Sequence, residues 1–141
     1  MTATCPAADL GARRRLRIVD DHAGFRAFAR ALLEAEGFSV VGEAVDGAAA
    51  VEAVTLLGPD IVLLDIALAD VDGFVVCERL AASAGTVSPA DARRPVIVLT
   101  SSRDVSSFRR RLTGSSARGF IAKRDLTGAA LAALVDGEPR G

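Results

Sequence analysis

The chain has 141 residues, of which half are apolar and a quarter charged, and its formal net charge is −1. This length suits one domain whose core needs neither disulfides nor a metal, and the mixed composition excludes a disordered chain. The near balance of 17 basic against 18 acidic residues argues against a polybasic binder of nucleic acid or membranes.

The cysteines and the N-terminal residues indicate where in the cell the protein is located. We expect Cys77 to lie in the core and Cys5 in a tail, since two cysteines make neither a disulfide framework nor a metal site. The first residues lack the basic-then-apolar order of a secretory signal, and no segment approaches the apolar length of a membrane span. We therefore expect a cytoplasmic protein.

Strand and helix patterns alternate along the chain. We expect a tail over 1–14, one domain over 15–137 and a second tail over 138–141. Short apolar runs predict five strands, at 16–19, 38–44, 60–65, 95–100 and 119–122. Helical spacing predicts five helices, at 23–36, 46–57, 74–82, 103–112 (weakly) and 126–135. Turn-forming residues over 83–94 predict an exposed loop.

This alternation predicts an α/β fold. Strands that are apolar on both faces indicate a parallel sheet covered on both sides, and right-handed crossovers then give a doubly wound arrangement. In such sheets the ligand site lies outside the carboxyl ends of the strands. We therefore look for chemistry at those ends.

Polar residues follow four of the five predicted strands, namely Asp20 and Asp21, Asp65, Thr100 and Lys123. Three neighbouring carboxylates repel one another and need a compensating cation. An all-oxygen donor set suits Mg²⁺ better than zinc. A hydroxyl and an ammonium facing the same pocket would hold a tetrahedral anion, so the set indicates phosphoryl transfer onto an aspartate.

The chain resembles the receiver domain of two-component response regulators over about residues 16–136. The resemblance rests on the order and spacing of five segments: Arg17-Ile18-Val19-Asp20-Asp21-His22, Asp60-Ile61-Val62-Leu63-Leu64-Asp65-Ile66, Asp72-Gly73, Val98-Leu99-Thr100-Ser101 and Gly119-Phe120-Ile121-Ala122-Lys123. The first and last segments are similar to those of receivers of the LuxR/NarL type. The resemblance implies a flavodoxin-like (βα)5 fold, with a five-stranded parallel sheet in the order 2-1-3-4-5.

The resemblance also implies roles for single residues. Asp65 would be the phosphoacceptor, and the Mg²⁺ ligands would be Asp20, Asp21, Asp65 and the backbone carbonyl of Ala67. Thr100 would hydrogen-bond the phosphoryl oxygen, and Lys123 would pair with the phosphoryl group. Phe120 matches the aromatic residue that turns inward on activation, although it also suits an ordinary core position. His22 is expected to be a loop residue near a helix start rather than a ligand.

Some positions depart from the family pattern. Ala69 stands where these domains usually carry a proline, Ala23 replaces another common proline, and the loop over 83–94 is longer than expected. After Lys123 comes Arg124, where many receivers have a proline. Ala69 and the long loop leave open a phosphorylation-independent receiver that acts as an interaction module.

Two further alternatives are open. The chain would also fit the truncated regulatory domain of a LuxR/NarL-type transcription factor. An aspartate-nucleophile phosphatase is disfavoured, because the first strand ends in Asp20-Asp21-His22-Ala23 without the second aspartate two residues on. We therefore expect no enzyme activity beyond self-phosphorylation from small donors and autodephosphorylation.

The partners that the resemblance implies are a sensor histidine kinase or a phosphotransfer protein. A homodimer through the fourth helix, fifth strand and fifth helix is a further expectation, and we expect neither direct nucleic-acid binding nor membrane contact. From residue 96 on, eight basic residues face four acidic ones. We interpret the arginines of this region as either a solvated face or a docking surface: Arg103, Arg109, Arg110, Arg111, Arg118 and Arg124.

Overall fold

The computed structural model describes residues 14–50, 60–68, 70–84, 95–103 and 105–136. One sheet runs through these residues, and all of its strand pairs are parallel. Its order is β2-β1-β3-β4-β5, as predicted for the doubly wound fold. The strands are β1 (Arg15–Val19), β2 (Ser39–Ala44), β3 (Ile61–Asp65), β4 (Val96–Ser101) and β5 (Gly119–Ala122).

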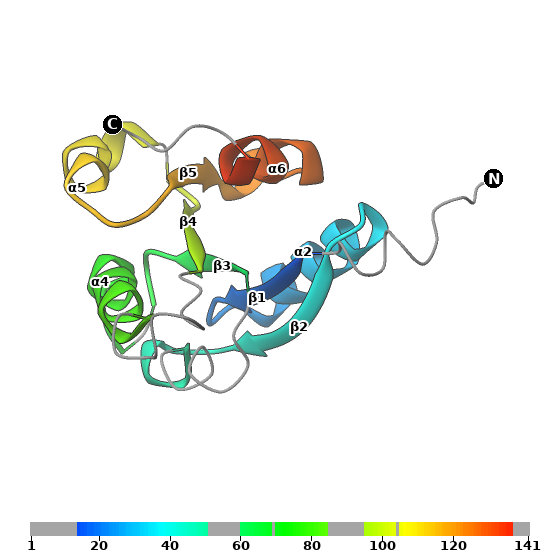
Figure 1. Ribbon diagram of the computed structural model, residues 1–141, viewed down its shortest axis with the longest axis horizontal. Helices are drawn as coiled ribbons and strands as arrows, with labels where there is room; N and C mark the ends of the chain where they lie inside the picture. The colour runs from blue at the N-terminus through cyan, green and yellow to red at the C-terminus, as the bar shows by residue number, and fades with distance from the viewer. Residues whose placement is uncertain (1–13, 51–59, 69, 85–94, 104, 137–141) are drawn as a thin grey trace.

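Helices cover both faces of the sheet (Figure 1). In this view α4 (Gly73–Ala84) and α5 (Arg109–Thr113) lie on the left, with α2 (Ala23–Ala35) and α6 (Gly128–Asp136) on the right. There are also two 3₁₀ turns, η1 (Val105–Ser107) and η2 (Lys123–Asp125). None of the described helices has the length and apolar character needed to cross a bilayer.

Three predicted segments differ from the described elements or lie partly outside them. The prediction of one weak helix over 103–112 is wrong. The structure has two separate elements there, η1 and α5, and Phe108 lies between them. The loop expected from residue 83 starts too early, since α4 continues to Ala84; residues 85–94 lie outside the described part of the chain. Of the helix expected over 46–57, residues 47–50 are helical and 51–59 also lie outside it.

The core divides into two clusters because side chains alternate along each strand. One cluster joins β-strand residues to α2 and α6, and its sheet members include Leu16, Ile18, Ile61, Leu63 and Val98. The other joins the alternate positions to α4 and α5, and its sheet members include Val19, Val62, Leu64, Ile97 and Leu99. Both faces of β3 are therefore buried, and only its end is available for polar chemistry.

Both ends of α6 are held by side chains from other elements. The carboxylate of Glu36 accepts a hydrogen bond from the amide of Gly128, the first residue of the helix. At the other end, the Arg118 guanidinium donates to the carbonyls of Leu134 and Val135 at 3.3 and 2.9 Å. A carboxylate at the N-terminus and a cation at the C-terminus also complement the helix dipole. This helix is thus fixed against the sheet.

The segment after β3 folds back tightly. Ala67 and Asp72 form an antiparallel bridge, and the amide of Gly73 donates to the carbonyl of Ile66 at 2.7 Å. A Cβ at position 73 would collide with the carbonyl oxygen of Asp65 and would lie 2.6 Å from the Cα of Ile66. Both neighbours are backbone atoms, so they cannot rotate away, and this close approach requires glycine.

We predict that Gly73→Ala destabilises the protein, by about 1–3 kcal/mol, because the added methyl displaces the backbone at the end of β3. Gly24→Ala is the matched control, since Gly24 is exposed in the first turn of α2 and a Cβ there meets nothing within 4 Å. That variant should gain about 0.4–1 kcal/mol. Thermal unfolding followed by circular dichroism measures both, and a shift of the same sign in the two variants would contradict the argument.

Candidate functional site

Three polar residues meet at one edge of the sheet because their strands are neighbours. Asp65 and Thr100 are direct partners in the register between β3 and β4, and Asp20 follows Val19, which pairs with Leu64. Asp20, Asp65 and Thr100 are all buried, with exposed fractions of 0, 2 and 1%. The structure thus brings together the strand-end residues that the sequence singled out.

Lys123 completes this edge from the end of β5. Its Nζ lies 2.8 Å from Oδ2 of Asp20 and 3.4 Å from Oδ2 of Asp65, so one ammonium bridges the two buried carboxylates. The same Nζ lies 4.6 Å from the centre of the Phe25 ring. An aromatic face attracts a cation and shields it from water, so Phe25 helps to hold the ammonium over the carboxylates.

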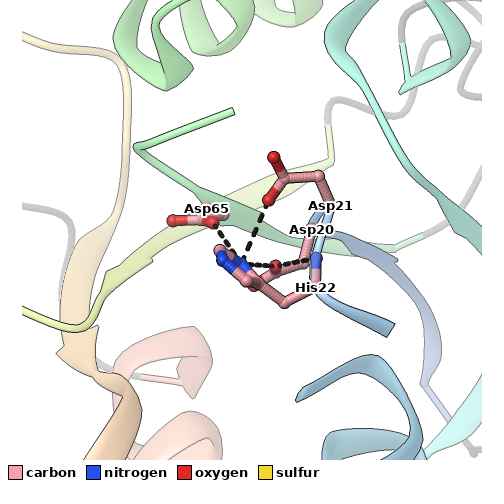
Figure 2. A group of neighbouring side chains, drawn as sticks. All are labelled: Asp20, Asp21, His22 and Asp65. Carbon is pink, nitrogen blue, oxygen red and sulfur yellow. Dashed lines mark hydrogen bonds and ion pairs between the residues drawn. The ribbon is translucent and has the colours of Figure 1, made fainter. Parts of the chain in front are cut away.

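Asp21 and His22 are the more exposed members of the group, with side chains 27% and 65% exposed, and Figure 2 shows them beside Asp20 and Asp65. The Nδ1 atom of His22 lies 3.0 Å from carboxylate oxygens of both Asp20 and Asp21, and 3.9 Å from Oδ2 of Asp65. The backbone amide of His22 also donates to Oδ1 of Asp20 at 2.8 Å. His22 lies just before α2, as expected, and its imidazole faces all three carboxylates.

The main chain around Asp20 is held from the second strand. Glu43 on β2 accepts hydrogen bonds from Arg26 and Arg30 of α2, at 2.9 and 2.8 Å. These guanidinium groups lower the pKa of the Glu43 carboxyl, Arg30 most strongly. Arg26 also donates to the carbonyl of Asp20 at 2.7 Å. The ion pairs thus tie α2 to the end of β1 and fix where Asp20 points.

Asp65 carries an unfavourable charge. Burial raises the pKa of its carboxyl above the ordinary value, and the Ala67 amide, which donates to Oδ1 at 3.1 Å, opposes that rise. The charge of Asp20 raises this pKa further, whereas Lys123 lowers it. The net direction is upward, so one ammonium does not neutralise the pair of buried carboxylates.

The polar atoms of the site fit a cation and an anion. Within the part of the chain that the structure describes, the hydroxyl of Thr100 has no hydrogen-bond partner, whereas Oδ2 of Asp20 pairs with the Lys123 ammonium. Carboxylate oxygens of Asp20, Asp21 and Asp65 lie close enough to share one ion. Oxygen donors of this kind suit Mg²⁺, and the free hydroxyl beside Asp65 suits an incoming oxyanion.

The structure tests neither of the expectations for Ala67 and Ala69. Ala67 is exposed beside Asp65, and its amide rather than its carbonyl makes the contact seen with that carboxylate. Its expected role as a carbonyl ligand is not tested by this contact. Ala69, which raised the question of a differently shaped loop, lies outside the described residues.

Phe120 lies half-buried on β5, next to the strand that carries Thr100. Its ring centre is 6.0 Å from that of Phe108, which in turn lies 6.2 Å from the ring of Phe74 at the start of α4. Such spacings are typical of packed aromatic pairs. A row of three rings therefore runs from β5 to the start of α4.

Arg111 and Arg118, which belong to the six arginines of this region, are engaged inside the molecule. Arg111 pairs with Asp72 at 2.7 Å and its guanidinium lies 4.3 Å from the centre of the Phe74 ring. Arg118 donates to carbonyls at the end of α6. Their charges hold α5 and α6 in place. Composition alone could not distinguish this internal role from a docking role.

Sequence reasoning missed three residues that the structure places at the site: His22 as a neighbour of all three carboxylates, Phe25 against Lys123, and Arg26 at the carbonyl of Asp20. The segment Asp20-Asp21-His22 offered a signal for His22, since imidazole and carboxylate are both common metal ligands. Nothing in the sequence distinguishes Phe25 from the other apolar residues of its helix.

Known proteins are similar to this chain over most of its length. A profile of the response regulator receiver domain matches residues 16–135. BvgA of Bordetella pertussis, a transcription regulator of virulence factors, is 34% identical over 111 residues, covering 79% of this chain and 49% of BvgA. The transcriptional regulatory protein PdtaR of Mycobacterium tuberculosis is 35% identical over 107 residues, covering 74% and 48%. The chain thus spans about half the length of the curated relatives it matches.

A solved structure extends the likeness to three dimensions. The receiver domain of the response regulator NarL from Mycobacterium tuberculosis superposes with a TM-score of 0.70 at 30% identity. The match covers 89% of this chain and 98% of that domain. The likeness therefore spans most of this chain and nearly all of the other.

We predict that Asp65→Asn stabilises the metal-free protein at neutral pH, raising Tm by a few degrees. Because the pKa of Asp65 is raised on folding, the folded state binds this proton more tightly than the unfolded chain does. The wild type therefore loses stability as pH rises from about 4, the unfolded pKa, through the folded pKa, and stays lower above it.

Thermal unfolding in a chelator from acid to neutral pH checks this. The advantage of Asp65→Asn should vanish at the acid end and reach its full size above the folded pKa. Asp21→Asn is the control, because the Asp21 side chain is 27% exposed and should give a smaller change. An advantage that does not vary with pH would contradict the electrostatic origin.

Proposed function

The chain belongs to the response regulator receiver domain family, and we propose that it accepts a phosphoryl group on Asp65. The donor would be a phosphohistidine of a sensor histidine kinase or of a phosphotransfer protein. One observation carries the proposal: the Lys123 ammonium bridges Asp20 and Asp65 beside a buried Thr100 hydroxyl that lacks a hydrogen-bond partner. A carboxylate nucleophile, a cation and a free donor at one point are what phosphoryl transfer requires.

Asp20, Asp21 and Asp65 would hold Mg²⁺, with the carbonyl of Ala67 as a further ligand. When bound, Mg²⁺ neutralises charge on the carboxylates and on the phosphoryl oxygens. The raised pKa of Asp65 supports this assignment, because the carboxylates need more positive charge than Lys123 supplies. The donor set, three carboxylates within reach of one ion, supports it independently.

In the transfer step, an Oδ atom of Asp65 attacks phosphorus in line with the leaving imidazole. The P–O bond forms as the P–N bond breaks, and the donor histidine leaves with the electron pair of that bond. Lys123, already 3.4 Å from Asp65, would pair with the new phosphoryl oxygens. Thr100 would donate its hydroxyl hydrogen to one of them, which would satisfy the buried oxygen.

We further propose that this bond drives the switch. Movement of Thr100 toward the phosphoryl group would free space beside β5, and Phe120 would turn into it. Phosphorylation would thus shift the population between two packings of the same fold. A cavity of about 550 Å³ on this side, lined by Val105, Phe120 and Leu134 among others, gives the aromatic ring room to change position.

The surface of α5, β5 and α6 would carry the output, as a homodimer contact or as a site for an acidic partner. With Arg111 and Arg118 engaged internally, Arg109 and Arg110 on exposed parts of α5 are the residues we assign to this contact. We propose that the protein acts in the cytoplasm as a switch rather than as an enzyme. It would bind neither nucleic acid nor membrane through this domain.

A second candidate follows from the relatives. Because several are transcription regulators about twice as long as the matched region, this chain would serve as the regulatory domain of such a regulator. A phosphorylation-independent interaction module is a third reading, but the complete set of Asp20, Asp65, Thr100 and Lys123 at one edge favours phosphorylation.

We predict that acetyl phosphate or phosphoramidate with Mg²⁺ adds one phosphoryl group to the wild type, seen by intact mass. Asp65→Asn should add none, because it lacks the nucleophilic oxygen. Asp60→Asn is the matched control: Asp60 immediately precedes β3, at the opposite end from Asp65, and should leave the reaction intact. A phosphoryl group gained by Asp65→Asn would contradict the assignment, as would Mg²⁺-independent labelling of the wild type.

We also predict that joint reversal of Arg109 and Arg110 to glutamate weakens phosphorylation-dependent association by tenfold or more, roughly 1.4 kcal/mol or above. Two cations would become anions on the proposed contact surface. Sedimentation of phosphorylated and unphosphorylated protein measures self-association. Capture of an acidic partner measures binding to that partner. Arg79→Glu, on α4, is the control; an unchanged response in the double variant would refute the role of α5.

A further inference from the structure

His22 is the only histidine of the chain, and the function proposed above does not use it. It occupies the N-cap position of α2 but makes no side-chain capping bond there. Instead its imidazole turns toward the carboxylates, with Nδ1 at 3.0 Å from both Asp20 and Asp21 (Figure 2). The side chain is 65% exposed, so packing does not impose this orientation. Attraction to the carboxylates explains it.

The four side chains lie close enough together for small side-chain movements to bring one atom of each onto a single ion. One ligand atom from each of Asp20, Asp21, His22 and Asp65 lies within 4.8 Å of the others. A tetrahedral ion with bonds of about 2.0–2.1 Å places its ligand atoms about 3.3–3.4 Å apart. The distances from Nδ1 to the three carboxylates, 3.0, 3.0 and 3.9 Å, lie on either side of that value.

A second feature of this cluster points to a ligand. Asp20 is completely buried, and its Oδ2 is already paired with the Lys123 ammonium at 2.8 Å. The buried Thr100 hydroxyl next to Asp65, in contrast, has no hydrogen-bond partner within the described residues. A buried hydroxyl is costly without a partner, so the pocket that Asp65 and Thr100 share favours an occupant.

The donor set distinguishes between cations. Mg²⁺ takes oxygen ligands and retains water, whereas Zn²⁺ and its transition-series neighbours bind imidazole nitrogen well. We propose that His22 supplies a fourth, nitrogen ligand, so that this carboxylate site also binds transition-series divalent cations, Zn²⁺ above all, in competition with Mg²⁺. This inference rests on the cation site of the proposed function but not on the phosphoryl transfer itself.

Zinc at this site would oppose phosphorylation. Four protein donors complete the tetrahedral coordination that closed zinc sites have, which leaves no position for a phosphoryl oxygen. Asp65 would also be held as a ligand instead of acting as a nucleophile. The imidazole thereby makes the same cluster responsive to a second cation, which holds the protein in its unphosphorylated state.

The single histidine makes the test direct. We would titrate ¹⁵N-labelled full-length chain carrying Cys5→Ser with Zn²⁺ and, separately, with Mg²⁺. The substitution removes one competing thiol; the other, Cys77, is buried, and burial raises its pKa to about 12. One imidazole signal set exists, and we expect Zn²⁺ but not Mg²⁺ to shift the Nδ1 resonance strongly. An Nδ1 resonance that does not move at saturating Zn²⁺ would overturn the proposal.

Affinities give the second measurement, by competition with a chromophoric zinc chelator and by amide titration for Mg²⁺. His22→Gln should weaken Zn²⁺ binding about tenfold or more and change Mg²⁺ binding by less than about twofold. Asp21→Asn should weaken both cations. Glu34→Gln, which alters an exposed carboxylate further along α2, should weaken neither.

The outcomes separate this inference from the proposed function. If the wild type binds Mg²⁺ and His22→Gln binds Zn²⁺ as tightly as the wild type does, the role of His22 is refuted and the Mg²⁺ site stands. If the wild type binds neither cation, both proposals fail. Selective loss of Zn²⁺ binding in His22→Gln, together with the Nδ1 shift, establishes the nitrogen ligand.

Discussion

The placement of two buried carboxylates side by side, with one ammonium between them, is the constraint on which the rest of this structure depends. Asp20 and Asp65 end neighbouring strands, so the parallel register forces them together. Their charges repel, and burial raises the cost. Lys123 reduces that cost only because β5, two strands away from β3, ends at the same edge. The sheet order is therefore as much a part of the site as the three side chains.

The surrounding elements keep this unfavourable arrangement in place. Arg26 holds the carbonyl of Asp20 while it pairs with Glu43, and the Ala67 amide holds one oxygen of Asp65. Gly73 lets the returning chain pass against the backbone of Asp65. Each contact uses backbone geometry or a paired charge, so the site keeps its shape before any ligand arrives. Preorganisation of this kind is what electrostatic catalysis requires.

The strands and the residues at their ends were predictable because parallel strands impose two simple rules, whereas the strand order came from the family resemblance. Buried strands read as continuous apolar runs, and their carboxyl ends share one edge, so Asp20, Asp65, Thr100 and Lys123 converge in any such fold. Side-chain direction follows no such rule. The imidazole of His22 and the ring of Phe25 reach the site through rotamers set by three-dimensional neighbours. Likewise, Phe108 packs between Phe74 and Phe120, and the expected single helix is divided at that residue.

The distribution of anchors indicates which surface can respond to the site. Glu36 and Arg118 hold α6 at both ends, and the α2 arginines hold the end of β1. By contrast, η1 and α5 are short, and Arg111 and the three aromatic rings connect them to α4 and β5. If Thr100 changes position, the fixed helix α6 therefore lies on one side of the change and the lightly held η1 and α5 lie on the other. We infer that η1 and α5 move first, because both are short and the Arg111–Asp72 pair that connects α5 to α4 is exposed.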